Sequence, residues 1–165
     1  MAKIKGFPVG VKFSDLEQGE LFVANRAEGA FYGLKGDDNG QMVAVVLAVP
    51  GGFDGLAPHF YDPAIFDGFF RLPYDPQIEP IEDGLPKRDL DAYRGSLMFD
   101  DAGKVWLRLA KLQWRWDVEI ETGTFGVAGK VLLETRAWRL VGHDGDREIE
   151  LMRHPEPKLA AALAL

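Results

Sequence analysis

Residues 97–120 read LMFDDAGKVWLRLAKLQWRWDVEI and carry the clearest secondary-structure signal of the chain. Asp101-Ala102-Gly103 predicts a three-residue hairpin connection, with Gly103 at the position that needs a positive φ. If Asp100 pairs with Lys104, the register is fixed and Met98 lies opposite Trp106. The other face of the hairpin is then apolar and consists of Leu97, Phe99, Val105 and Leu107.

The apolar positions change phase further along this stretch. They are odd-numbered from Val105 to Leu109 and even-numbered from Leu112 to Ile120. Because no Gly, Pro, Asn or Asp stands near the change to make a turn, the pattern predicts one long strand with a β-bulge at Ala110-Lys111. Beyond the bulge the alternation is strict, which excludes a helix there.

Length and composition predict one domain with a core of its own. The chain has 165 residues, and a domain of this size buries roughly 70% of its unfolded surface. It contains no cysteine, which excludes thiol catalysis, cysteine-bound zinc and iron–sulfur clusters and fits a reducing compartment. The net charge is −7, with the acidic excess in residues 1–91. General binding to nucleic acid is therefore not expected. The N-terminus lacks an apolar run, so neither a signal peptide nor a membrane span is predicted.

Residues 1–50 are expected to form strands after one helical turn. Ser14 and Glu17 predict a capped turn that ends at Gly19. Three strands are predicted to follow, at residues 20–25, 30–35 and 41–49. This opening resembles that of many small bacterial and phage β-modules. The resemblance covers under a third of the chain and implies no catalytic residues.

Residues 51–91 hold most of the prolines together with many aromatic residues. Seven of the ten prolines lie between Pro50 and Pro86. Since proline lacks an N–H donor, poor strand pairing is expected, while the aromatic content argues against disorder. We therefore predict a long, ordered, irregular cover over the sheet, with one helical turn in which Asp62 is the cap and Pro63 the first residue.

Residues 92–155 predict a strand meander and residues 156–165 a short apolar tail. A strand is expected over 130–141, and His143-Asp144-Gly145-Asp146 closes a hairpin onto 147–153. The fold class is therefore mainly β: a single domain, 1–165, in which an antiparallel meander forms a curved sheet or partly open barrel. One or two helical turns and the long Pro/Gly/aromatic segment complete it.

The candidate binding residues are aromatic and basic. Trp106 lies opposite the apolar face, beside Arg94 and Arg108, and is expected to be partly exposed unless residues 51–91 cover it. His59 and Tyr61 belong to the aromatic segment, and ordered segments of that length are often functional. Ligand or partner contact is therefore predicted at His59, Tyr61, Arg94, Trp106 and Arg108.

Catalytic and cofactor signatures are weak or missing. No nucleophile motif or phosphate-binding loop is present, and catalytic residues, metal ligands and cofactors are not predicted. The weak metal candidates pair His59 with Asp62 and His143 with Asp146. Asp62 has a capping role, however, and Asp-Gly-Asp is ordinary turn chemistry.

The function predicted first is a non-catalytic binding or assembly module of the bacterial cytoplasm. Its partner is an unidentified protein or small ligand, and a homo-oligomer is possible. The first alternative is a β-barrel that holds a small apolar molecule, lined by Trp114, Trp116 and the phenylalanine cluster. A metal-dependent hydrolase that uses one of the His–Asp pairs is the less favoured alternative.

Overall fold

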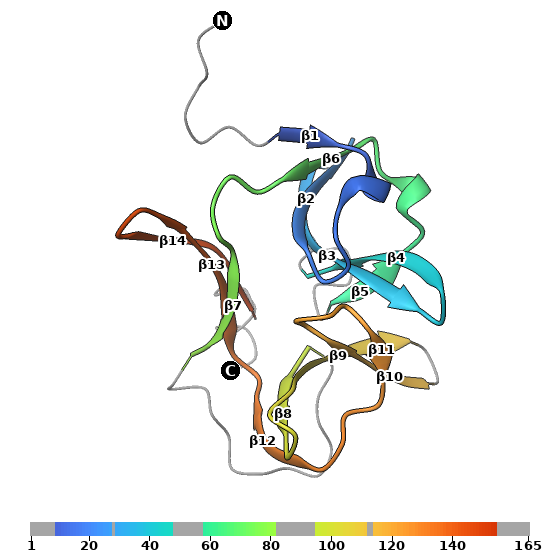
Figure 1. Ribbon diagram of the computed structural model, residues 1–165, viewed down its shortest axis with the longest axis vertical. Coiled ribbons are helices and arrows are strands. Elements are labelled where there is room, and N and C mark those ends of the chain that lie inside the picture. Colours follow the sequence, from blue (N-terminus) through green and yellow to red (C-terminus); the bar gives the residue numbers. More distant parts are fainter. Residues whose placement is uncertain (1–8, 28, 48–57, 82–94, 112–113, 155–165) are drawn as a thin grey trace, which may run out of the picture.

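The computed structural model describes residues 9–27, 29–47, 58–81, 95–111 and 114–154. These residues form a mainly β fold of three antiparallel sheets, with six, five and three strands, and no barrel closes (Figure 1). The predicted fold class is confirmed. Within the described ranges, neither of the short helical turns approaches the length and apolar character needed to cross a membrane.

The six-stranded sheet has the order β1-β6-β2-β3-β4-β5. Its strands are β1 (Val9–Val11), β2 (Leu21–Arg26), β3 (Gly29–Asp38), β4 (Gln41–Val46), β5 (His59–Tyr61) and β6 (Gly68–Arg71). The predicted strands near residues 20–25, 30–35 and 41–49 are thus confirmed as β2, β3 and β4. The β3–β4 turn uses Asn39 and Gly40, both at positive φ, which is the dipeptide that tight hairpins favour.

The five-stranded sheet has the order β11-β10-β9-β8-β12. Its strands are β8 (Leu97–Asp100), β9 (Val105–Lys111), β10 (Trp114–Glu119), β11 (Phe125–Gly126) and β12 (Val131–Thr135). The predicted β8–β9 register is confirmed, because Met98 lies opposite Trp106 and Gly103 has a φ of +77°.

The predicted bulge at Ala110-Lys111 is wrong. The chain reverses instead, and β10 pairs antiparallel with β9, with Lys111 opposite Trp114. Two residues separate Lys111, the last residue of β9, from its partner Trp114, the first residue of β10. Each odd-numbered residue of β9 therefore pairs with an even-numbered residue of β10, as Leu109 does with Trp116. The change of phase was real, but a hairpin causes it.

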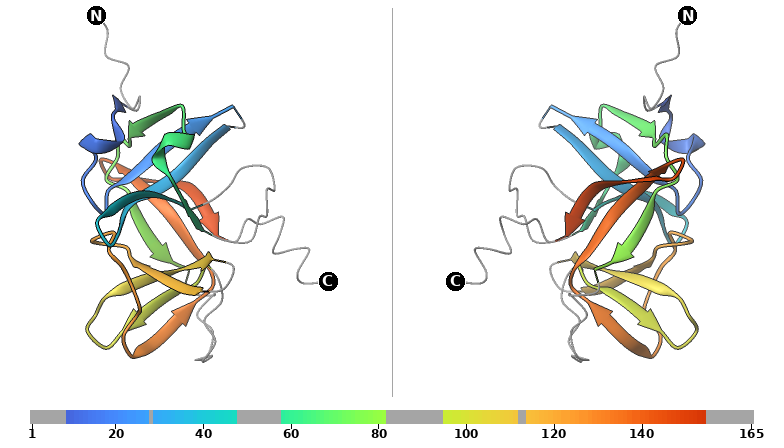
Figure 2. Two further views of the ribbon diagram at one scale, coloured as in Figure 1. Left: turned by 90° about the vertical axis from the view of Figure 1, so that its right-hand side faces the viewer. Right: turned by 90° about the vertical axis from the view of Figure 1, so that its left-hand side faces the viewer.

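The three-stranded sheet has the order β14-β13-β7 and lies beside the other two (Figures 1 and 2). It consists of β7 (Gln77–Pro80), β13 (Trp138–Asp144) and β14 (Arg147–His154). The predicted final hairpin is confirmed. The strand predicted over 130–141 is two strands, β12 and β13, which belong to different sheets. They are separated at Arg136-Ala137, where the Thr135 hydroxyl donates to the Ala137 carbonyl at 2.9 Å.

The prediction of an irregular cover over residues 51–91 is wrong in its described part, residues 58–81. β5, β6 and β7 each pair with a neighbour, and β6 lies between β1 and β2. The prolines stand where the sheets tolerate them, since Pro80 is the last residue of an edge strand and Pro63 begins a helical turn. The predicted tail, 156–165, lies outside the described residues.

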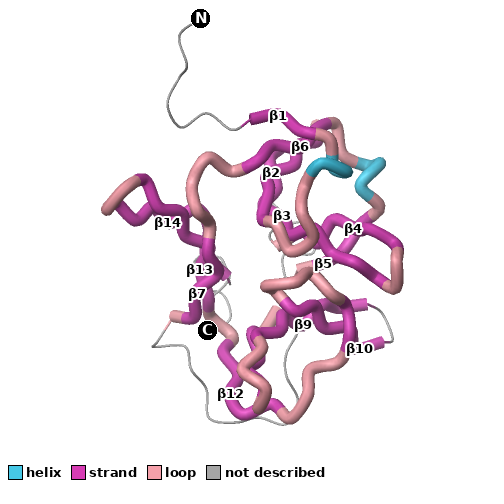
Figure 3. The backbone as a smooth tube through the Cα atoms, in the orientation of Figure 1, coloured by secondary structure: helices cyan, strands magenta, loops and turns pink. Residues whose placement is uncertain are grey.

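Both predicted helical turns exist as short 3-10 segments, η1 (Phe13–Asp15) and η2 (Pro63–Ile65) (Figure 3). The Asp62 carboxylate accepts from the Ala64 N–H at 2.9 Å, which confirms its capping role. The cap predicted at Ser14 is wrong, because Lys12 holds that position and no side chain caps η1. The buried Lys35 ammonium stabilises η1 by donating hydrogen bonds to the carbonyls of Phe13 and Leu16, at 3.1 and 2.6 Å.

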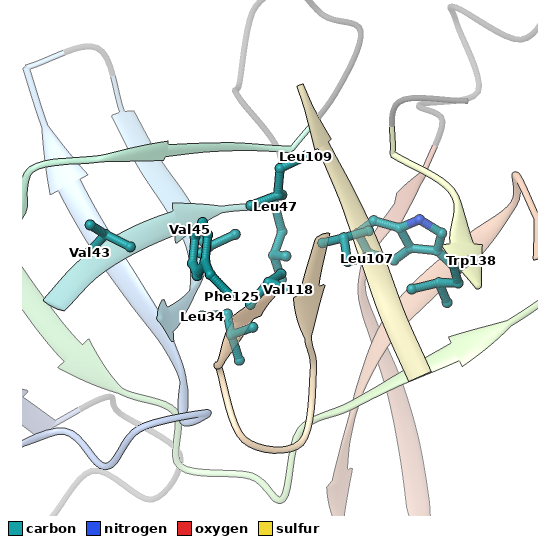
Figure 4. Close-up of a cluster of buried hydrophobic side chains, with 10 residues drawn as sticks. Leu34, Val43, Val45, Leu47, Leu107, Leu109, Val118, Phe125 and Trp138 are labelled. Carbon is teal, nitrogen blue, oxygen red and sulfur yellow. The ribbon is translucent and has the colours of Figure 1, made fainter. Parts of the chain in front are cut away.

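The main core lies where the three sheets meet. It combines Leu34, Val43, Val45 and Leu47 of the six-stranded sheet with Leu107, Leu109, Val118 and Phe125 of the five-stranded sheet and Trp138 of the three-stranded sheet (Figure 4). A second cluster on the opposite face of the six-stranded sheet packs around Phe22 and Phe69. The six-stranded sheet is therefore covered on both faces.

Candidate functional site

The face of the five-stranded sheet that points away from the core carries a layer of polar and charged side chains. Because Leu107 and Val118 point into the core, their neighbours on β9 and β10 point to the other side. Trp106, Arg108, Asp117 and Glu119 lie there in two cross-strand pairs, Trp106 with Glu119 and Arg108 with Asp117. We call these four residues, with Asp100, the polar layer.

Within the polar layer, Asp117 is only 1% exposed and accepts three hydrogen bonds. The Arg108 guanidinium donates through Nε at 2.9 Å and through Nη2 at 3.3 Å, and the Ala128 N–H donates at 3.1 Å. Charge-assisted bonds of this kind compensate a buried carboxylate for the water it has lost.

Asp100 organises the β8–β9 turn from the same layer. Its carboxylate accepts from the N–H groups of Ala102 and Lys104 and from the Trp106 indole at 2.8 Å. Desolvation by burial pushes the pKa of Asp100 upward, but these donors, with the Gly129 N–H, hold it below its ordinary value. Asp100 therefore stays ionised and stabilises the β8–β9 turn, a role unlike that of a general acid.

Residues 127–130 cross the polar layer as a strap that joins β11 to β12. Ala128 and Gly129 donate their N–H groups to Asp117 and Asp100, and the Asp101 N–H donates to the Lys130 carbonyl at 3.0 Å. β11 and β12 are opposite edges of the sheet, about 19 Å apart if it were flat. The chain from Gly126 to Val131 reaches at most about 18 Å. The sheet must therefore curve toward the strap.

Trp106 is more deeply buried than the sequence predicts. The sequence predicts a partly exposed Trp106 unless residues 51–91 cover it, whereas its side chain is only 7% exposed. Gly126, next to the strap, lies against the indole ring, and the Lys104 ammonium sits 5.7 Å from its centroid. Arg108 lies in the same polar layer, where it pairs with Asp117. Arg94 lies outside the described residues. Ligand contact at these residues stays a prediction.

His59 and Tyr61 lie on the other side of the main core. Phe60, between them, packs into that core 5.3 Å from Phe125, so its two neighbours point the opposite way. Their rings are 5.0 Å apart, and Tyr61 also meets Phe66 at 6.4 Å. The structure therefore divides the predicted binding residues into two groups with the core between them.

A third candidate, which sequence reasoning missed, is an apolar surface on the strap and β12. Val127 is 77% exposed, Leu132 55% and Leu133 38%. We call these three residues the β12 surface. A register shift between Val131 and Leu133 interrupts the alternation, so two consecutive leucines are exposed. The pair Leu132-Leu133 was a usable signal, because a half-buried strand alternates apolar with polar residues.

Two observations concern the alternative functions, which stay predictions. Across the described ranges, no group of three or more His, Cys, Asp or Glu side chains is placed to hold a metal ion. Trp116, proposed to line a ligand cavity, packs against the main core 6.2 Å from Phe125.

Comparison with known proteins yields no relative. No protein-family model, no curated protein and no solved structure matches the chain.

Proposed function

We propose that the chain is a non-catalytic binding or assembly module that engages another protein through the β12 surface. The observation that carries this proposal is the exposure of the adjacent Leu132 and Leu133 on the edge strand β12, with Val127 also exposed on the strap that leads to it. Adjacent exposed apolar side chains, such as Leu132 and Leu133, are typical of protein-binding sites. A location in the bacterial cytoplasm belongs to the same proposal, and a chain without cysteine is compatible with such a reducing compartment.

The state of the polar layer also supports binding over catalysis. The carboxylates of Asp100, Asp117 and Glu119 accept hydrogen bonds from groups of the protein itself, and Trp106 is only 7% exposed. Groups engaged in this way hold the fold together. The β12 surface, by contrast, presents side chains whose burial against a partner would be favourable, at roughly 25 cal/mol per Å².

The test is native mass spectrometry of the untagged protein as it comes from cells. The wild-type chain should carry a second protein chain, and Leu132→Asp should release it, since a charge at an apolar contact must be desolvated. Val9→Asp is the matched control, because Val9 is 65% exposed but lies on β1 in another sheet. A wild-type chain found only at its own mass, or a complex that survives Leu132→Asp, would refute the proposal.

A further inference from the structure

The β3–β4 turn exposes an Asn-Gly dipeptide, which is a reactive sequence as well as a favoured turn sequence. Asn39 and Gly40 are both exposed, with φ values of +54° and +91°, and open space surrounds the position of a Cβ on Gly40. The backbone nitrogen that follows an asparagine can attack the carbon of the side-chain amide. Glycine hinders that attack least, because it has no side chain and turns freely.

The reaction at this dipeptide needs water and no other reactant. The Gly40 nitrogen loses its proton to water and forms a bond to the carbonyl carbon of the Asn39 side chain. The bond from that carbon to Nδ2 breaks, and Nδ2 leaves as ammonia after taking up a proton. Water then opens the resulting succinimide ring at either carbonyl, which gives aspartate at one and isoaspartate at the other. Both products add a negative charge to the turn, and isoaspartate also lengthens its main chain by a methylene.

The turn holds both reacting groups in hydrogen bonds to carboxylates. The Gly40 N–H donates to the Asp37 carboxylate at 2.5 Å, and Nδ2 of Asn39 donates to the Asp38 carboxylate at 3.1 Å. The first bond bears directly on the rate, because Asp37 accepts the proton that must leave. An anion that forms on the Gly40 nitrogen would also lie beside a negative carboxylate, which is unfavourable. Asp37 should therefore slow the attack.

We propose that Asn39 is a site of spontaneous deamidation and that the Asp37 carboxylate sets its rate. The chain contains two asparagines, so the other one, Asn25, is an internal comparison. Asn25 lies in β2, which pairs with β3 on one side and with β6 on the other, and Arg26 follows it. Both ladders hold the backbone of Asn25, and the residue after it carries a side chain. Asn25 should therefore stay intact while Asn39 reacts.

The experiment incubates the full-length protein in warm neutral buffer. Peptide mapping by mass spectrometry follows the amides of Asn39 and Asn25 and separates aspartate from isoaspartate. The amide of Asn39 should be lost and that of Asn25 kept, and isoaspartate should appear, because it forms only by opening of the ring. An intact Asn39 after a synthetic peptide of residues 35–43 has been converted would overturn the site. Aspartate without isoaspartate would overturn the ring as the route.

Three variants test the role of Asp37. Asp37→Ser removes the carboxylate that holds the Gly40 N–H, whereas the control Asp38→Ser removes a neighbouring charge and leaves that bond in place. Asp37→Ser should react at least about threefold faster than the wild type, on the scale of one hydrogen bond to a charged group, and Asp38→Ser should change the rate less.

Asp37→Asn keeps the size of the side chain and removes its charge, so it should also react faster than the wild type even if Asp37→Ser weakens the turn. Urea unfolding shows that each variant is folded during the incubation. The role of Asp37 is overturned if Asp37→Asn reacts at the wild-type rate, or if Asp38→Ser accelerates the reaction as much as Asp37→Ser does.

Discussion

Two glycines at positive φ meet where the six-stranded and five-stranded sheets join. Gly19 has a φ of +82° and Gly123 a φ of +68°, and a Cβ on Gly123 would collide with the Lys35 carbonyl and the Gly19 nitrogen. The Gly123 carbonyl also accepts from the Asp37 N–H at 2.8 Å. At the residue scale, this joint depends on the absence of two side chains.

Gly123→Ala should therefore destabilise the protein far more than an ordinary glycine substitution. The matched control is Gly103→Ala, because Gly103 has a similar φ of +77° but open space around its Cβ position. The control should lose about 1–2 kcal/mol from the conformation alone. Gly123→Ala should lose at least about twice that, because backbone must also move. Urea unfolding measures both, and equal losses would show that the joint has room to adjust.

His154 makes stability depend on pH. Its ring stacks on Trp138 with centroids 5.0 Å apart, and desolvation by burial lowers its pKa from 6.5 to about 4. Between these values the unfolded chain binds the proton more readily, so the contribution is complete above pH 6.5 and is lost as the pH falls to 4. The loss should reach about 3 kcal/mol. Urea unfolding from pH 7.5 to 4.5 should show a steeper decline for the wild type than for His154→Phe. Equal slopes would remove His154 as the cause.

At the element scale, the strap and the polar layer act as one unit. Asp117→Ala removes the carboxylate that holds both the Arg108 guanidinium and the Ala128 N–H, and it should cost about 3–5 kcal/mol. Glu79→Ala is the control, since it breaks the partly exposed pair of Glu79 with Arg139 and should cost under about 1 kcal/mol. Chemical unfolding gives both values. Hydrogen exchange at Ala128 and Gly129 should also accelerate in Asp117→Ala alone, and an unchanged strap would contradict the coupling.

The elements differ in how far their sequences determine them. The β8–β9 hairpin was predictable to the register, because Gly103 and the alternation around it agree. The β9–β10 hairpin was not, since a bulge and a two-residue connection change the phase in the same way and no turn residue distinguishes them. The strands within residues 58–81 were not predicted, because proline is unfavourable inside strands. Edge strands and strand ends nevertheless tolerate it, as Pro80 shows at the end of β7.

The candidate site was harder to predict than the elements. The alternation placed Trp106 and Arg108 on one face, as observed, but it could not reveal how deeply Trp106 is buried there. That burial depends on contacts such as the Ala128 N–H with the Asp117 carboxylate, which lie outside the regular strand pairing. Such contacts follow from tertiary structure, which local periodicity does not encode.

At the scale of the whole molecule, one core joins all three sheets. Trp138 comes from the three-stranded sheet, packs with residues of the other two, and donates its indole N–H to the Gly95 carbonyl at 2.8 Å. Sheets that share a core in this way are expected to unfold together, as the predicted single domain requires.

Trp138→Phe tests that cooperativity. Losing the indole hydrogen bond and part of the ring volume should cost about 2 kcal/mol, which accelerates exchange through global unfolding roughly thirtyfold. If the sheets unfold together, the slowest amides of β3 and β4 should accelerate as much as those of β13, although β3 and β4 belong to another sheet. Arg139→Gln, on the same strand, removes only the partly exposed ion pairs with Glu79, Glu148 and Glu150 and should change neither set by more than a few-fold. Acceleration confined to β13 and β14 would mean that the three-stranded sheet opens on its own, and the shared core would then not make the molecule one folding unit.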